Sequence, residues 1–60
     1  MNLEQAKNEL EKIEYQNRTW DSKFMREQSI WDEIAMHINS STGEKKKHWS
    51  LVMDLYKEKN

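Results

Sequence analysis

Cysteine and proline are absent from this 60-residue sequence, and Gly43 is its only glycine. Without cysteine, neither a disulfide bond nor a thiolate metal site can compensate for a small core. A chain of this length buries only about 60% of its unfolded surface, so helix packing or self-association must stabilise it. The missing proline and the abundance of Glu, Lys, Gln and Leu favour helix. We therefore expect an all-α fold in one small domain over residues 1–60.

Long hydrophobic runs are also lacking, since no wholly apolar stretch exceeds three residues. Nothing in the sequence is therefore long enough to span a bilayer. The first residues are polar and acidic, unlike a signal peptide or a cationic transit peptide. We expect a soluble intracellular protein that has no membrane partner.

Positive charge is scarce for a nucleic-acid-binding protein. Ten Lys and Arg residues face eleven Asp and Glu residues, and the formal net charge is −1, whereas nucleic-acid-binding domains are commonly strongly basic. The charge is unevenly distributed, because residues 44–60 carry five lysines against three acidic residues. The basic end of the molecule is therefore the last expected helix.

Apolar residues recur at helical spacing in three segments of the chain. Asn2 is a candidate N-cap for the first segment. Ser29 and Ser41 each precede an acidic residue by three positions, which is typical of a capping box, and they mark the start of the other two segments. A polar turn at residues 39–43 separates the second segment from the third. The expected helices cover residues 2–17, 29–39 and 42–58.

Aromatic side chains are large enough to supply much of a small core. Trp31 and Trp49 each begin an apolar stripe, one on either side of the polar turn. We expect a three-helix bundle whose second and third helices resemble a helix-turn-helix. The predicted core residues are Leu10, Ile13, Trp20, Trp31, Ile34, Ile38, Trp49, Val52 and Tyr56.

A second interpretation of the first two segments stays open. One heptad frame runs from residue 3 to residue 38, and only Asn17 and Glu27 are polar in it. A single long helix would then fold back as a helical hairpin or pair in a coiled-coil dimer. The low helix propensity of residues 16–22 and the capping signal at Ser29 favour a break instead.

Two motifs on either side of the polar turn resemble a known family. Residues 31–35 read Trp-Asp-Glu-Ile-Ala, and residues 46–49 read Lys-Lys-His-Trp, with Tyr56 seven residues beyond the second tryptophan. This pattern is similar to that of Myb/SANT-like domains, and its closest likeness is to their MADF branch. Trp20 looks like the family's first aromatic landmark. The resemblance covers about residues 10–58.

The resemblance implies a tri-helical fold and a nuclear DNA-binding role in transcription or chromatin regulation. Several members of the family bind proteins instead. The sequence departs from the family pattern in two places. The interval from Trp20 to Trp31 is shorter than usual, and Leu51, Asp54 and Leu55 stand where a basic third helix would carry arginine.

If the last helix enters a DNA major groove, its lysines would contact phosphates and Ser50 would lie near a base edge. Asp54, on the same face, would repel phosphate. The alternative interpretation of this face is an ordinary solvated surface. The predicted nucleic-acid-binding residues are Lys45, Lys46, Lys47, Ser50 and Lys57.

A protein-binding surface is the second hypothesis. Leu51 and Leu55 lie to one side of the Trp49 stripe and would form an exposed apolar strip, unless the first helix covers them. Such a strip would bind a protein partner or a second copy of the chain. DNA binding ranks marginally ahead of a protein-interaction or dimerisation module that makes no contact with nucleic acid.

Motifs for catalysis and metal binding are missing from the sequence. There is no Ser/His/Asp set, no glycine-rich phosphate loop and no pair of carboxylates suited to acid–base chemistry. His37 follows Glu33 by one helical turn, but the further ligands that a metal needs are lacking, so we expect a surface pair. His48 is expected at the rim of the core beside Trp49. We predict that the protein is not an enzyme and uses no metal, cofactor or small-molecule substrate.

Overall fold

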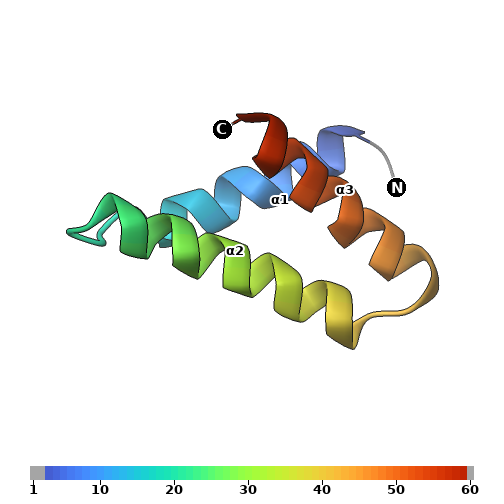
Figure 1. The fold of residues 1–60 in the computed structure, drawn as a ribbon. Coiled ribbons are helices and arrows are strands. Elements are labelled where there is room, and N and C mark those ends of the chain that lie inside the picture. The colour runs from blue at the N-terminus through green and yellow to red at the C-terminus, as the bar shows by residue number, and fades with distance from the viewer. Residues whose placement is uncertain (1–2, 60) are drawn as a thin grey trace.

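The computed structural model describes residues 3–59, which form three α-helices. They are α1 (Leu3–Gln16), α2 (Lys23–Ser40) and α3 (Gly43–Lys59). α1 and α2 diverge from the short connection that joins them, and α3 returns to pack against both (Figure 1). The predicted all-α three-helix bundle is therefore confirmed.

The hydrophobic core lies where α3 meets the other two helices. Each helix contributes the residues of one side, at the three- and four-residue spacings of an amphipathic helix. Ile34 and Val52 are fully buried at the centre. Burial of one such side chain stabilises the fold by about 1.5–3 kcal/mol. The buried apolar residues are Ala6, Leu10, Ile13, Ile30, Ile34, Val52, Met53 and Tyr56.

The break between α1 and α2 falls where the low helix propensity predicts it, but α2 begins six residues earlier than expected. Ser22 has extended backbone angles (φ −95, ψ 130), and its side chain accepts a hydrogen bond from the Met25 amide. Ser22 is thus the N-cap, and the predicted start at Ser29 is wrong. Ser29 lies inside α2, where its hydroxyl donates to Asn17 Oδ1 at 2.6 Å. The predicted cap Asn2 lies outside the described residues.

The turn between α2 and α3 agrees closely with the sequence prediction. Ser41 ends α2 in an extended conformation, and its amide donates to the Ile38 carbonyl at 3.4 Å. Gly43 follows with φ +61, a left-handed conformation that only glycine adopts at little cost. The single glycine of the chain is therefore the first residue of α3, where the chain changes direction after α2.

Two tryptophans of the predicted core are exposed instead. Trp20 lies in the connection and is 42% exposed, and Trp31 on α2 is 40% exposed. The heptad frame of α1 does not continue through the connection, because the turn at residues 17–22 changes the phase of the helix. Ile30 and Ile34 consequently face the core, and Trp31, about 100° from Ile30 around the helix axis, is turned outward.

Candidate functional site: an aromatic groove between α2 and α3

An open groove of about 370 Å³ runs along the outside of the bundle between α2 and α3. Its walls combine aromatic rings with one cation and one carboxylate. We call it the aromatic groove. Its lining residues are Phe24, Glu27, Gln28, Trp31, Tyr56 and Lys57.

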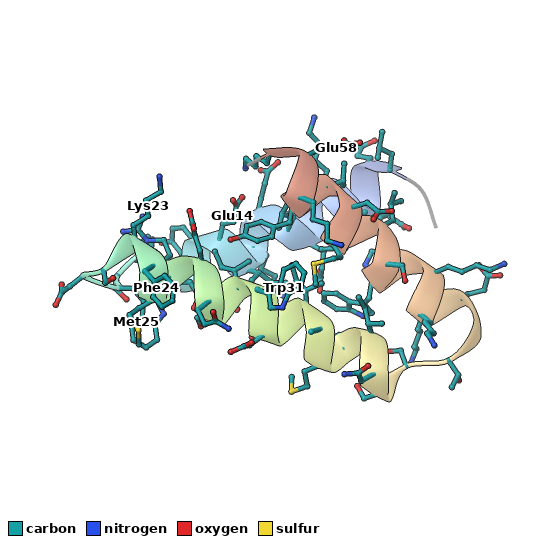
Figure 2. The ribbon with its side chains drawn as sticks, in the orientation of Figure 1. Glu14, Lys23, Phe24, Met25, Trp31 and Glu58 are labelled. Atoms are coloured by element: carbon teal, nitrogen blue, oxygen red, sulfur yellow. The ribbon has the colours of Figure 1, made fainter. Side chains whose placement is uncertain are left out.

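The α2 wall of the groove follows from helix geometry. Phe24 and Trp31 are seven residues apart, so they lie on one side of α2, two turns and roughly 10 Å apart along its axis. The inner side of the same helix is taken by Ile30 and Ile34. Phe24 is 71% exposed, the largest value among the exposed large hydrophobic side chains of residues 3–59. Figure 2 shows Phe24 near the start of α2 and Trp31 farther along it.

The α3 wall places two different groups next to these rings. The Tyr56 ring is buried, and its hydroxyl donates to the Glu27 carbonyl at 3.4 Å. The Lys57 ammonium lies 5.4 Å from the centroid of the Trp31 ring, within reach of a cation–π interaction. Within residues 3–59, no ion pair joins the Glu27 carboxylate or the Lys57 ammonium to another side chain. The groove therefore holds two opposite charges that form no ion pair within the described part of the chain.

A hydrogen-bonded cluster around Asn17 holds the start of α2 in place. Asn17 is only 8% exposed, and its Nδ2 donates to the Ile13 carbonyl at 2.9 Å. Its Oδ1 accepts from Trp20 Nε1 at 2.9 Å and from Ser29 Oγ at 2.6 Å. One side chain thus links the end of α1, the connection and α2. The cluster fixes the angle at which α2 leaves α1, and hence where Phe24 is displayed.

Trp49 belongs to α3 and packs near the C-terminal end of α2, where its surroundings differ from those of Trp31. The His37 ring stacks on it with the ring centroids 3.9 Å apart and the planes 5° from parallel. The His48 ring meets it edge-on at 5.4 Å. His48 therefore packs beside Trp49 as predicted. His37 was expected in a surface pair with Glu33, and its stacking on α3 corrects that expectation.

The five residues predicted to contact nucleic acid do not share one surface. Lys46, Lys47 and Ser50 lie together on the open side of α3, where Asp54 also lies. Lys45 faces α1 and lines a hollow with Glu9. The fifth residue, Lys57, lies in the aromatic groove. The reason is the helical period, because three consecutive residues point in three directions about 100° apart.

The two leucines predicted to form an exposed strip are half-buried and pack against the core. Leu51 borders the surface that carries Lys46 and Lys47. Leu55 lies beside Leu10 of α1, in a hollow of about 290 Å³. The more exposed apolar surface is on α2, at Phe24 and Trp31. The sequence predicts Trp31 in the core and Phe24 in no site. Their positions in the heptad frame, seven residues apart, are a sequence signal that both rings lie on one side of a helix.

Two kinds of feature are absent from residues 3–59. No group of three or more His, Cys, Asp or Glu side chains is arranged to hold a metal ion. None of the three helices has the length and apolar character needed to cross a membrane. Comparison of the chain with protein-family models, curated proteins and solved structures gave no match. The Myb/SANT-like resemblance therefore stays a prediction.

Proposed function

We propose that this protein is a protein-interaction module whose docking surface is the aromatic groove. The occupant is an α-helix of another polypeptide chain. The observation that carries this proposal is the exposure of Phe24 and Trp31 on one side of α2, beside Lys57.

The physics of helix recognition supports this assignment. Helices that dock into grooves are held by apolar anchors spaced three, four and seven residues apart. The rings of Phe24 and Trp31 are separated by two helical turns, which matches that spacing. Tryptophan and tyrosine are also enriched among the residues that dominate binding energy at interfaces. An aromatic surface held by a rigid helix loses little conformational entropy when it is covered.

Position-specific photo-crosslinking in living cells tests the proposal. We expect a photoreactive amino acid at Gln28, an exposed residue that lines the groove, to give a covalent polypeptide adduct. The adduct should disappear when Phe24→Ala is added. The matched control places the same photoreactive group at Asn8, on the exposed surface of α1, and should give no such adduct. Equal adducts from both positions, or an adduct that does not depend on Phe24, would contradict the proposal.

DNA binding is the second candidate function, and one observation favours it. Lys46, Lys47 and Ser50 share an open surface on α3. Asp54 on that surface and Glu44, 3.9 Å from Lys47, reduce its positive potential. We therefore rank it below protein docking.

A salt titration tests this second candidate. Affinity for a fluorescent DNA duplex should fall steeply with salt if lysines neutralise phosphates, because each contact releases condensed counterions. The slope of log affinity against log salt concentration is proportional to the number of phosphate contacts. The double substitution of Lys46 and Lys47 by alanine should make it less steep by the amount expected for about two contacts. Absence of binding at low salt would eliminate DNA as the partner.

A further inference from the structure

We infer that the helix occupying the aromatic groove is α2 of a second copy of this chain, running antiparallel to the first. This inference rests on the proposed function and names the partner. A two-fold axis passes between Glu27 and Gln28 of both copies. It places Phe24 of each copy against Trp31 of the other.

The spacing of the anchors makes the groove complementary to itself. Phe24 and Trp31 lie at equal distances in sequence from the point between Glu27 and Gln28. An antiparallel arrangement about that point therefore matches ring to ring at both ends. Aromatic pairs attract each other beyond the gain from burying their surface, best in offset or edge-to-face arrangements. Two-fold symmetric dimers, in which one surface pairs with itself, are the commonest oligomers.

The unpaired charges of the groove also complement each other across this axis. α2 and α3 run roughly antiparallel (Figure 1), and the Tyr56 hydroxyl donates to the Glu27 carbonyl, so the end of α3 lies level with the second turn of α2. The Lys57 ammonium sits over Trp31 on the α3 side of the groove. Glu27 of the second copy lies one turn beyond its Phe24, on that same side. The antiparallel pair thus brings each Lys57 near the Glu27 carboxylate of the other copy.

The area available predicts a weak dimer. A buried aromatic covers about 150–250 Å², so the exposed parts of Phe24 and Trp31 amount to roughly 200 Å² in each copy. Even with the stems of Gln28 and Lys57, the interface falls short of the roughly 1,200–2,000 Å² of stable complexes. We expect dissociation constants on the order of 10–100 µM, which sedimentation equilibrium measures directly.

A charge-reversal pair tests the inference on the full chain. Glu27→Lys puts two cations at each contact of a homodimer, and Lys57→Glu puts two carboxylates there. Each variant alone should dimerise at least about tenfold more weakly than the original chain. An equimolar mixture of the two variants restores both attractive contacts, so it should dimerise again. An effect confined to one molecule cannot be restored by mixing.

The control variant is Lys46→Glu, which reverses a charge on the open side of α3. It should dimerise like the original chain, and it should bind the Glu27→Lys variant more weakly than Lys57→Glu does, because one of the two contacts in that mixed dimer still joins two cations. Far-ultraviolet circular dichroism of every variant verifies that the three helices are intact. A chain that is monomeric at millimolar concentration, or a mixture that stays monomeric, would overturn the inference.

The crosslinking experiment separates failure of this inference from failure of the proposed function. An adduct at Gln28 with twice the mass of the 7.4 kDa chain identifies the second copy. An adduct of another mass that still depends on Phe24 keeps the proposed function and overturns the identity of the partner. Absence of any adduct overturns both.

Discussion

Trp31 and Trp49 are the same residue type on facing helices, yet they have opposite surroundings. Trp49 is half-buried, with His37 stacked on one face and His48 against its edge. Trp31 is 40% exposed, and among residues 3–59 its one ring or cation–π contact is with the Lys57 ammonium. Burial of an aromatic ring away from water lowers the free energy. An exposed ring on a rigid helix therefore marks a surface that another molecule can cover. One tryptophan stabilises the fold, and we propose that the other binds a partner.

Alanine substitution of the two tryptophans should show the largest difference. Trp49→Ala removes a half-buried ring and leaves a cavity, so we expect a loss of about 3 kcal/mol in the free energy of unfolding. Trp31→Ala should cost about 1 kcal/mol, because much of the ring is already in water. Urea denaturation of both variants at low protein concentration measures the two values. Equal losses would mean that both rings serve the fold alike.

Asn17 should have the next largest effect, because it connects the two regions through the start of α2. Asn17→Ala removes the acceptor of Trp20 and Ser29, and we expect a loss of about 2 kcal/mol. Ser29→Ala is the matched control, since Asn17 keeps its other partners, and should cost about 1 kcal/mol or less. The measurement is urea denaturation. If Ser29→Ala proves more costly than Asn17→Ala, the cluster is not centred on Asn17.

Gly43 determines where α3 begins, and therefore where Trp49 lies. Gly43→Ala should cost about 1–2 kcal/mol, because a side chain is strained at φ +61. A Cβ at this position would meet no other atom within 4 Å, so the loss comes from the backbone alone. Thermal unfolding by circular dichroism measures it. Gly43→Asn should cost less, since asparagine tolerates the left-handed conformation, and the reverse order would contradict this explanation.

The ion pair at the far end of α3 should have the smallest effect. Lys59 Nζ lies 2.8 Å from Glu14 Oε1, but both side chains are partly exposed. Lys59→Ala should lower the free energy of unfolding by about 0.5 kcal/mol and less at high salt, because solvent screens exposed pairs. A loss above that of Gly43→Ala would show that the seam between α1 and α3 depends on charge more than on packing.

The sequence predicts where the helices lie better than it predicts which side of each helix faces the core. The helical spacing of Ala, Leu and Ile residues identifies the side of α1 that faces the core. The polar turn with Gly43 locates the start of α3 within one residue of the structure. The sequence misses the start of α2 because Ser29 has the capping-box pattern, with an acidic residue three positions on, whereas the actual N-cap, Ser22, has none. Ser29 bonds Asn17 instead of capping a helix. A capping motif read locally cannot include a hydrogen bond to a residue twelve positions away.

The candidate site was harder to predict for a related reason. The heptad frame correctly groups Phe24 with Trp31, but it assigns that side to the core. A change of helix phase at residues 17–22 turns Phe24 and Trp31 outward, while Ile34 of the same frame stays buried. The phase depends on how Asn17 and Trp20 pack. The sequence predicts one surface for the lysine cluster, whereas helical geometry separates Lys45 from Lys46 and Lys47. Sequence spacing therefore identified the aromatic residues of the groove but not the direction they face.

The central claim is that the Phe24 side of α2 is available for association and contributes little to the stability of one chain. The dependence of the urea midpoint on protein concentration, for the original chain and for Phe24→Ala, tests it most directly. We predict that the two chains agree within about 0.5 kcal/mol at low micromolar concentration. At millimolar concentration the midpoint of the original chain should rise, because dimerisation stabilises only the folded form, and that of Phe24→Ala should stay constant. A variant that is destabilised at every concentration, or an original chain whose midpoint never changes, would contradict the claim.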